Sequence, residues 1–415
     1  MERPYAKVII NKKAEKLLKS GHPWVYGEET QGPAEPYENG DIVDVFTEKG
    51  SWMGSGFIND NSKIRVRLIS RNTNDRFDEA FWRRRVEYAV DYRKVVMGPD
   101  FACCRLIFGE ADSFPGLTVD KFEDVLVTEV LSLGIEKIKD LIYRLLKETL
   151  EAGGCKVRCI YERNEAALRL KEGMEQGKGY YAAEGSAAAA SELPGVVDDG
   201  HVTITENGVL YDVDYVNGQK TGFFLDQKYN RAAASKLAAG MRVLDCFTHT
   251  GAFALNCAKG GAAHVTAVDI SADAVAQTNK NIAMNGLSDR IDTVQADVFD
   301  YLTELAASKK HPYDFIILDP PAFTKSGATV KNAYRGYKEI NLKAMKILPR
   351  GGYLATCSCS HFMTAELFRK MVAEAAKDAG VQLRQIEERR QSPDHPILWG
   401  VPETEYLKFL IFQVV

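Results

Sequence analysis

The chain has 415 residues, of which 45% are hydrophobic and 27% are charged, a composition typical of a folded globular protein. A formal net charge of −4 excludes a protein that coats nucleic acid through an overall positive charge. No run approaches the ~20 consecutive apolar residues that a membrane helix needs, and the first residues lack the apolar core of a signal peptide. At roughly 100–200 residues per domain, the length predicts two to four domains, and we expect neither a membrane protein nor a secreted one.

The eight cysteines are too sparse in a chain of this length to form a disulfide scaffold. They predict reduced thiols and therefore a cytoplasmic protein. Because the cysteines and histidines do not pair at zinc-finger spacing, we expect no metal site.

The first 70 residues alternate short apolar runs with turn residues such as glycine, asparagine and aspartate. This pattern predicts a small β-barrel-like domain of strands and turns. The strands are expected at 7–10, 41–46, 51–60 and 63–70. A helix is predicted over 75–97, where apolar side chains recur at helical spacing on one side and the arginines lie largely elsewhere.

Basic residues concentrate between residues 61 and 94, where ten lysines and arginines stand against five acids. This excess of five is compatible with a solvated helix face. The alternative is a phosphate-contacting patch in an otherwise acidic protein, which would permit selective RNA binding. Reversing the charges of Arg83, Arg84 and Arg85 by substitution with glutamate would distinguish the two interpretations.

Residues 101–165 predict the order strand, strand, helix, strand, with the second strand over 117–131 and the helix over 135–153. This is the order of a compact α+β domain. The stretch 172–200, which contains an alanine-rich run, is expected to be a flexible junction. Asn207-Gly208 between two alternating segments predicts a hairpin over 201–215.

From about residue 241 the chain alternates strands and helices, which predicts an α/β fold with a parallel sheet covered by helices on both faces. Ligands of such sheets bind beyond the carboxyl ends of the strands. The first strand leads into VLDCFTHTGAFAL, whose turn contains a single glycine, Gly251. The turn therefore has neither the dinucleotide-binding pattern G-x-G-x-x-G nor a phosphate-binding P-loop.

Three of the following strands end in an acidic residue: Asp269, Asp297 and Asp319. One such residue is often only a helix cap or a turn residue. Three of them at one edge of the sheet predict a nucleoside-bearing ligand without a pyrophosphate, of which S-adenosylmethionine is the common one. Asp269 can accept hydrogen bonds from both ribose hydroxyls. The rigid turn at Pro320 and Pro321 suits the holding of a flat base near that ligand.

Cys357 and Cys359 alternate with polar residues at the carboxyl end of a later strand, so both are expected to face the same side. The other six cysteines lie among apolar residues and are expected to be packing residues. His249 and His361 flank the same edge of the sheet, where they are either structural hydrogen-bonded residues or proton carriers.

The most specific motifs of the chain are QKTGFFLDQ and SPDHP…EYLK, accompanied by RVRLISR, GEADSFPGLTVDKFEDVLV, VLDCFTHTGAFAL, DPPAFTKS and CSCS. Through these motifs, and over nearly its whole length, the chain resembles the ribosomal RNA large-subunit methyltransferase I family. Members of that family are S-adenosylmethionine-dependent RNA cytosine-5 methyltransferases. The DPP turn and the ribose-binding aspartate are shared by many methyltransferases and identify only the superfamily.

The resemblance implies three domains: a PUA-like RNA-binding β-barrel at 1–72, a central α+β domain at 73–192, and a Rossmann-like class I methyltransferase domain at 193–415. It implies that the chain forms 5-methylcytosine in 23S ribosomal RNA. The expected partner is ribosomal RNA, no membrane is involved, and the expected state is a monomer or a homodimer.

The resemblance also implies roles for single residues. Cys359 matches the family's nucleophile, and Asp319 would contact the target base. Asp269 would hold the ribose of S-adenosylmethionine, and Asp297 would hold its adenine amino group. The complete set implied in cofactor binding is Gln227, Phe247, Thr248, Thr250, Gly251, Asp269, Asp297 and Pro320.

The expected reaction needs a cysteine because carbon 5 of cytosine is a poor nucleophile. A thiolate that adds at carbon 6 makes carbon 5 enamine-like, an acid near N3 stabilises the adduct, and a base removes the carbon-5 proton. RNA cytosine-5 methyltransferases outside this family often carry a second cysteine after the Asp-Pro-Pro-type turn. This chain has Ala322 there, so release of the thiol uses another group or water.

Two alternatives remain. An amino-group methyltransferase acting on adenine places an aromatic residue directly after Pro-Pro, whereas this chain has Ala322 before Phe323, and such an enzyme needs no cysteine. A non-catalytic RNA-binding protein that retains the fold is disfavoured by the intact acids at three strand ends. Failure to bind S-adenosylmethionine would favour that second alternative.

Overall fold

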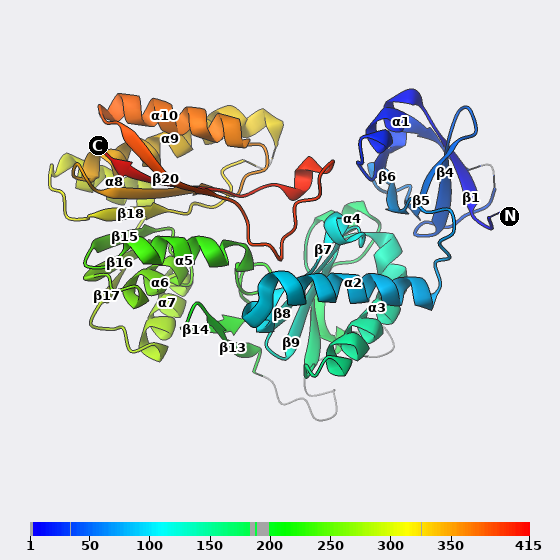
Figure 1. Ribbon diagram of the computed structural model, residues 1–415, viewed down its shortest axis with the longest axis horizontal. Helices are drawn as coiled ribbons and strands as arrows, with labels where there is room; N and C mark the ends of the chain where they lie inside the picture. The colour runs from blue at the N-terminus through cyan, green and yellow to red at the C-terminus, as the bar shows by residue number, and fades with distance from the viewer. Residues whose placement is uncertain (1–2, 34, 183–186, 189–198, 325) are drawn as a thin grey trace. The chain divides into compact units, whose positions relative to one another are not determined.

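Figure 1 shows the computed structural model, which describes residues 3–33, 35–182, 187–188, 199–324 and 326–415. The chain forms two compact units. The N-terminal unit comprises Met1–Ile204, Val213–Leu225 and Pro393–Thr404, and the C-terminal unit comprises Thr205–Asp212, Asp226–Ser392 and Glu405–Val415. In the part of the chain that the structure describes, no helix is long and apolar enough to cross a membrane.

The N-terminal unit begins with a six-stranded sheet in the order β2-β6-β5-β4-β1-β3. Its strands are β1 Ala6–Ile10, β2 Trp24–Tyr26, β3 Thr30–Gln31, β4 Ile42–Thr47, β5 Trp52–Ile58 and β6 Ile64–Ser70. The four predicted strands are confirmed as β1, β4, β5 and β6. Their inward-facing valines and isoleucines, among them Val8, Val45 and Val66, form the core of this sheet.

Helix α1, Lys12–Lys19, differs from the expectation of strands and turns alone. The side chain of Asn11 accepts hydrogen bonds from the backbone N–H groups of Lys13 and Ala14 and so caps the helix. Only Ala14 and Leu18 are buried among its eight residues. The apolar periodicity is therefore too short to reveal the helix in the sequence.

The second part of the N-terminal unit is an α+β arrangement. Its six-stranded sheet has the order β12-β11-β10-β9-β8-β7, and the segment predicted as one strand over 117–131 is instead a hairpin that turns at Glu123, whose φ is 55°. The strands are β7 Cys103–Phe108, β8 Leu117–Phe122, β9 Val125–Val130, β10 Cys159–Asn164, β11 Gly177–Tyr181 and β12 Ala187–Ala188. The helices are α2 Glu79–Met97, α3 Leu133–Ala152 and α4 Leu168–Lys171.

The prediction of a flexible junction over 172–200 is wrong for its first part. Strand β11 pairs antiparallel with β10, and the rings of Tyr161 and Tyr180 meet edge to face with centroids 4.9 Å apart. The rest of that stretch lies mostly outside the described residues, as does the predicted domain boundary at residue 192. The hairpin predicted at Asn207-Gly208 is confirmed by β13, His201–Glu206, and β14, Val209–Asp214.

Helix α2 confirms the helix predicted over 75–97, and it buries Phe81, Trp82 and Val86. The same face also buries Arg93, which is an exception to the expectation that the arginines lie largely elsewhere. Arg93 is 0% exposed, and its guanidinium binds both carboxylate oxygens of Asp112, at 2.5 and 2.7 Å. A buried charge is tolerated at a core position when a bidentate partner neutralises it.

The C-terminal unit contains a seven-stranded sheet in the order β17-β16-β15-β18-β19-β21-β20, in which β21 runs antiparallel to both of its neighbours. The strands are β15 Arg242–Cys246, β16 His264–Asp269, β17 Ile291–Gln295, β18 Phe315–Leu318, β19 Tyr353–Ser358, β20 Leu383–Arg389 and β21 Lys408–Val414. The helices are α5 Lys228–Leu237, α6 Ala252–Lys259, α7 Ala272–Met284, α8 Val298–Ala307, α9 Val330–Ile347 and α10 Ala365–Ala379. The predicted α/β fold is confirmed.

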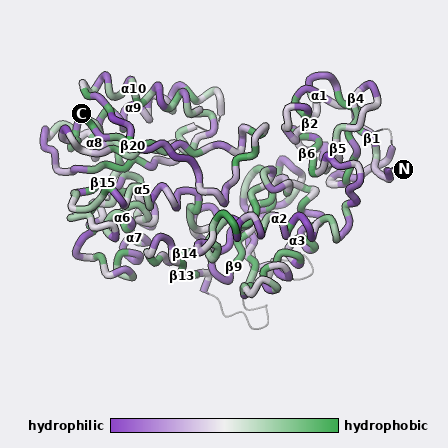
Figure 2. The backbone as a smooth tube through the Cα atoms, in the orientation of Figure 1, coloured by the Kyte–Doolittle hydropathy of each residue, from purple (hydrophilic) through white to green (hydrophobic). Residues whose placement is uncertain are grey.

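In Figure 1, α5, α6 and α7 cover one face of this sheet and α8, α9 and α10 cover the other. A core of buried residues, including Ile316, Tyr337, Leu354 and Phe368, joins the sheet to the second group of helices. Figure 2 shows hydrophobic and hydrophilic stretches alternating along α9 and α10, as expected of helices that present one face to a core.

Short 3-10 helices complete the described part of the chain at Gly27–Glu29, Gly98–Ala102, Gly109–Asp112, Leu225–Gln227, Gly327–Thr329 and Pro402–Thr404.

The strand order of the C-terminal sheet reverses direction at β15, which lies between β16 and β18. A crevice for ligands forms outside the carboxyl ends of parallel strands at such a reversal. The residues that follow β15, β16, β18 and β19 are therefore the first candidates for a site.

Candidate functional site

The loop after β15 has an unusual backbone. Phe247, His249 and Gly251 have φ angles of 62°, 52° and 79°, and a non-glycine residue in this region stores about 1–3 kcal/mol of strain. The His249 N–H donates to Asp269 Oδ2 at 2.9 Å, and the His249 carbonyl accepts from Thr278 Oγ1 at 2.9 Å. A Cβ at Gly251 would lie 2.7 Å from Thr278 Cγ2. Neighbouring elements thus hold this loop in a strained shape, as is common where backbone approaches a ligand.

Asp245, at the end of β15, is a buried carboxyl group with an unmatched oxygen. Its Oδ2 accepts from Thr248 Oγ1 at 2.6 Å and from the Ala254 N–H at 3.0 Å. Its Oδ1 has no hydrogen-bond partner among the described residues. Burial raises the pKa of Asp245 to about 7, and the charges of Asp319 and Asp269 act in the same direction. A buried acceptor in an acidic surrounding favours a cationic donor as its partner.

Asp269, at the end of β16, keeps acceptor capacity on both oxygens. Oδ1 accepts the Ser271 N–H at 3.0 Å, and Oδ2 accepts the His249 N–H at 2.9 Å. Each carboxylate oxygen can take a second donor. Asp297 caps helix α8 by accepting the Phe299 N–H on Oδ1 at 2.7 Å, which is the capping role that a strand-end acid often has.

Asp319, directly after β18, lies among polar groups of the C-terminal unit. The amide of Gln227 donates to its Oδ1 at 3.0 Å, and the Cys357 thiol also hydrogen-bonds to it. Burial, together with the charge of Asp226, raises the pKa of Asp319 to about 7. The Tyr406 hydroxyl occupies Asp226 Oδ2 at 2.6 Å, whereas the buried Oδ1 has no partner in the described part of the chain. Asp319 can therefore hold or release a proton near neutral pH.

The two cysteines of CSCS differ in environment. Cys357, within β19, is 0% exposed, and burial raises the pKa of its thiol far above the ordinary value. Cys359 lies one residue beyond β19 and is half-buried. Thiolates form more readily in partly exposed, electropositive surroundings than in apolar burial.

Lys408 supplies a positive charge beside Cys359. Its backbone pairs with Ser358 across β19 and β21, and its Nζ donates to the carbonyls of Ser360 and Tyr406, both at 2.7 Å. Lys408 thus contacts both sequence neighbours of Cys359: its ammonium binds Ser360, and its backbone pairs with Ser358. Burial lowers the pKa of Lys408 to about 8, against the opposing attraction of Cys359 and Glu405.

Aromatic side chains close the same edge of the sheet. Phe323 packs against Tyr337, with ring centroids 4.5 Å apart, and against Phe299 and Phe247 at 5.8 and 6.4 Å. The Tyr337 hydroxyl accepts from Ser358 Oγ at 3.1 Å. These rings form an apolar floor next to the acidic groups, which suits a ligand with both a flat ring and charged groups.

The structure places most of the predicted site residues at the carboxyl edge of the C-terminal sheet. Gln227 contacts Asp319 directly, Thr248 contacts Asp245, and the Thr250 carbonyl accepts from the buried Asn281. Gly251 and Pro320 are buried, and Phe247 is half-buried. The described residues contain no cluster of histidine, cysteine, aspartate or glutamate that could hold a metal ion.

Of the two histidines weighed as proton carriers, His249 has its pKa lowered by burial, which favours the neutral imidazole. His361 is exposed and packs edge to face on Phe362.

Two residues of the site, Asp245 and Lys408, are absent from the set of site residues predicted from the sequence. The position of Asp245 at the end of the first strand is a signal that could have identified it, whereas the neighbours of Lys408 become visible only when β21 pairs with β19.

The basic stretch 61–94 does not form one continuous patch. Four of its arginines are ion-paired: Arg65 with Asp60, Arg67 with Glu110 and Glu172, Arg83 with Glu79 and Glu148, and Arg93 with Asp112. The predicted role of Arg83 in RNA contact is weakened by its two carboxylate partners. Arg84 and Arg85 form no ion pair among the described residues.

Family models place this geometry in a known class. Residues 186–413 match an S-adenosylmethionine-dependent methyltransferase family, and residues 8–71 match a PUA-like domain. The fold is also that of a solved S-adenosylmethionine-dependent methyltransferase from Streptococcus mutans, with a TM-score of 0.80, 22% identity, and coverage of 99% of this chain and all of that one. A second solved methyltransferase, which contains S-adenosylhomocysteine, has a TM-score of 0.80 at 23% identity and the same coverage. The chain is an S-adenosylmethionine-dependent methyltransferase.

Curated relatives narrow the class. The chain is 39% identical to the ribosomal RNA large subunit methyltransferase I of Shewanella denitrificans, covering 96% of this chain and 97% of the relative. It is 38% identical to that of Alteromonas mediterranea, covering 99% of both. The chain therefore belongs to the ribosomal RNA large subunit methyltransferase I family. The predicted division at 1–72, 73–192 and 193–415 stays a prediction.

Proposed function

We propose that this methyltransferase forms 5-methylcytosine in 23S ribosomal RNA through a covalent bond between Cys359 and carbon 6 of the target cytosine. The observation that carries the proposal is the placement of Cys359 just beyond β19, half-buried and flanked by the Lys408 ammonium. Cys357, in contrast, is enclosed and hydrogen-bonded to Asp319. Only one of the two cysteines is therefore suited to attack a base.

The residues at the sheet edge fit S-adenosylmethionine. When bound, this cofactor supplies a methyl group that transfers as an electrophile from a sulfonium sulfur. The unmatched Oδ1 of Asp245 would accept the cofactor's ammonium group, and the free acceptor positions of Asp269 would take the ribose hydroxyls. Asp297 would take the adenine amino group. The loop and turn residues that would line the same site are Gln227, Phe247, Thr248, Thr250, Gly251 and Pro320.

Cys359 acts as the nucleophile in this proposal. The Lys408 ammonium stabilises its thiolate, because a fixed positive charge beside a thiol favours the deprotonated form. The sulfur–carbon 6 bond forms as the electron pair of the carbon 5–carbon 6 double bond moves toward carbon 5, which then takes the methyl group. Loss of the carbon-5 proton to a base restores the double bond and releases the thiolate.

Asp319 holds the proton that this addition requires. Since its pKa is about 7, a substantial fraction is protonated at neutral pH and can donate to N3 of cytosine while carbon 6 accepts the thiolate. N3 returns this proton to the Asp319 carboxylate as carbon 5 takes the methyl group. The proposal therefore predicts that kcat/KM falls as the pH rises above about 7. Asp319→Asn keeps a hydrogen-bond donor but cannot transfer a proton, so it should lower the rate and flatten this alkaline limb.

A direct product analysis tests the proposed function. The purified chain is incubated with methyl-labelled S-adenosylmethionine and a 23S ribosomal RNA transcript, and the RNA is digested to nucleosides. Label in 5-methylcytidine that disappears in Cys359→Ser but persists in Cys357→Ser supports the proposal. Label in N6-methyladenosine, unaffected by either cysteine substitution, would show an amino-group methyltransferase instead.

A further inference from the structure

The N-terminal unit contains a cavity of about 490 Å³ between the end of β6 and the first turns of α2. None of its residues belongs to the methyl-transfer site described above. The cavity is lined by Ser70, Arg71, Asn72, Asp75, Phe81, Arg84, Arg85 and Tyr88.

The cavity collects arginines that are hydrogen-bonded to backbone carbonyls but form no ion pair among the described residues. Arg71, Arg84 and Arg85 form no ion pair with a carboxylate in the part of the chain that the structure describes, unlike the four paired arginines of the same stretch. Its single acid, Asp75, accepts hydrogen bonds from Ser70 and Asn72. Three guanidinium groups and one carboxylate leave a formal charge of +2 around one cavity.

Backbone contacts fix the arginines without neutralising them. Arg71 donates to the carbonyls of Leu18 and His22, at 2.5 and 2.9 Å. Arg85 donates to the Ile69 carbonyl at 3.1 Å, and its guanidinium lies 5.1 Å from the centre of the Phe81 ring. A guanidinium has five N–H donors, so most remain available to a ligand. Burial lowers the pKa of both arginines, and a bound anion would compensate this cost.

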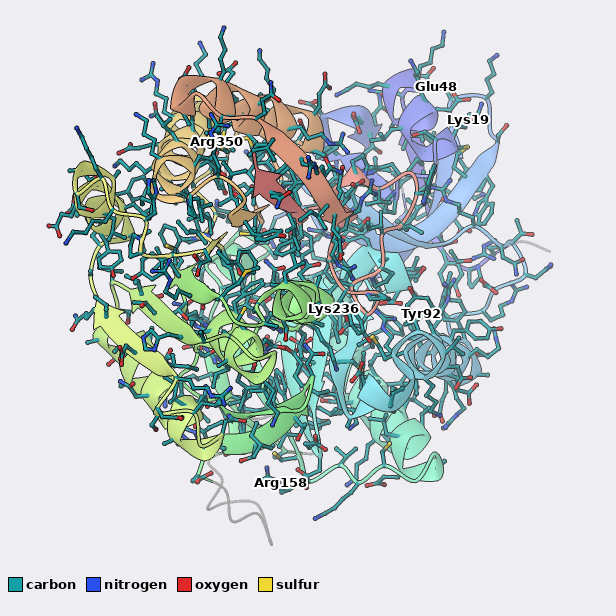
Figure 3. All side chains as sticks on the ribbon, turned by 60° about the vertical axis from the view of Figure 1, so that its left-hand side comes forward. Lys19, Glu48, Tyr92, Arg158, Lys236 and Arg350 are labelled. Carbon is teal, nitrogen blue, oxygen red and sulfur yellow. The ribbon has the colours of Figure 1, made fainter. Side chains whose placement is uncertain are left out.

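An exposed aromatic ring stands beside these charges. Tyr88 is 66% exposed and follows Arg84 by four residues and Arg85 by three, which places all three side chains on neighbouring parts of the α2 surface. Tyr92, which Figure 3 labels, lies one turn further along α2 and has its hydroxyl bonded to the Pro393 carbonyl at 3.0 Å. Tyr88 thus differs from Tyr92 in offering an open ring.

We propose that this cavity binds one nucleotide of a single-stranded segment of the ribosomal RNA substrate, with the phosphate against Arg71, Arg84 and Arg85 and the base stacked on Tyr88. Guanidinium groups suit phosphate oxygens, and an open ring beside them suits an unstacked base. The inference rests on membership of the ribosomal RNA methyltransferase family and not on the cytosine-5 chemistry. It assigns RNA contact to a defined subsite rather than to the whole basic stretch.

The test compares neighbouring residues that lose the same charge. Equilibrium binding of the full-length chain to a 23S ribosomal RNA transcript is measured over a salt series, in the Cys359→Ser background so that no covalent adduct forms. Arg84→Gln should weaken binding about 5- to 10-fold and reduce the slope of log K against log salt concentration by about 0.7. Arg83→Gln should leave both nearly unchanged, because Arg83 is already paired with Glu79 and Glu148.

The proposed stacking of a base on Tyr88 is tested separately. Tyr88→Ala should weaken RNA binding about fivefold or more with an unchanged salt slope, and Tyr88→Trp should restore the affinity. Equal effects of Arg83→Gln and Arg84→Gln would overturn the proposal in favour of diffuse charge. So would Arg84-dependent binding to phosphatidylglycerol vesicles without an effect on RNA. Because binding is read without turnover, failure here leaves the cytosine-5 proposal standing, and failure of that proposal leaves this one standing.

Discussion

The carboxyl edge of the C-terminal sheet and the cavity beside α2 have opposite charges but share one property. At the sheet edge, Asp245 and Asp319 form no ion pair among the described residues, and burial raises the pKa of each to about 7. In the cavity, Arg84 and Arg85 form no ion pair within the part of the chain that the structure describes. Arg93, in contrast, is a buried charge that is paired with Asp112. We infer from this contrast that charge without an ion-pair partner marks the candidate ligand sites of the chain, whereas the net charge of −4 conceals both of them.

The largest expected effect is on stability, when the buried ion pair of Arg93 and Asp112 is broken. Arg93→Met should lower the free energy of unfolding by about 3–5 kcal/mol, because it leaves the Asp112 carboxylate without its partner in the interior. Urea unfolding of the full chain measures this. A change below 1 kcal/mol would mean that the pair is not structural, and the contrast between paired and unpaired arginines would fail.

At the sheet edge, Asp269→Ala should weaken S-adenosylmethionine binding by roughly 2–4 kcal/mol, since two charge-assisted hydrogen bonds to the ribose would be lost. Calorimetry with the purified chain gives the affinity. Asp292→Ala, an exposed acid on the neighbouring strand β17, is the control and should bind the cofactor normally. Unchanged affinity in Asp269→Ala would remove this residue from the site.

Asp245→Asn should have opposite effects on stability and on binding. The pKa of Asp245 is raised from its ordinary value of 3.8 to about 7, so its contribution to stability is present below pH 4 and is lost as the pH rises through 7. The asparagine variant avoids this loss and should be about 4 kcal/mol more stable than wild type at pH 8, with little difference at and below pH 4. Urea titrations at the two pH values measure the gain. Cofactor binding should weaken at the same time, and a variant less stable at pH 8 would contradict the assignment.

The smallest of the four effects belongs to Lys408. Lys408→Gln should slow methyl transfer about tenfold at pH 7 and shift the acid limb of the pH–rate profile upward, because the thiolate of Cys359 loses its neighbouring charge. Single-turnover rates over a pH series measure both changes. Lys280→Gln, at an exposed lysine of α7 that pairs with Asp212, is the matched control. A slower rate with an unshifted profile would indicate a merely structural role.

The fold was largely predictable because its elements carry local signals. The βα alternation after residue 241 and the turn at Asn207-Gly208 both appear in the structure as expected. Helix α1 could not be predicted because only two of its residues are buried. The sequence of β8 and β9 indicates a single strand because the turn between them, at Glu123, contains no glycine or proline.

The site was predictable where a residue follows a strand, as Asp269 and Asp319 do, because the carboxyl ends of parallel strands meet. It was not predictable where long-range pairing brings groups together. Lys408 reaches Ser360 from 48 residues away, and the Cys357 thiol meets Asp319 across neighbouring strands. The partners of the arginines depend likewise on tertiary contacts, so the ten basic residues of 61–94 could not be sorted in advance.

The measurement that tests the central claim most directly uses RNA with 5-fluorocytidine at the target position. Fluorine at carbon 5 cannot leave as a proton, so the bond between Cys359 and carbon 6 should persist after methyl transfer. Wild type and Cys357→Ser should give a denaturation-resistant protein–RNA band, and Cys359→Ser should give none. A band that persists in Cys359→Ser, or methylation without a band in any variant, would contradict the account.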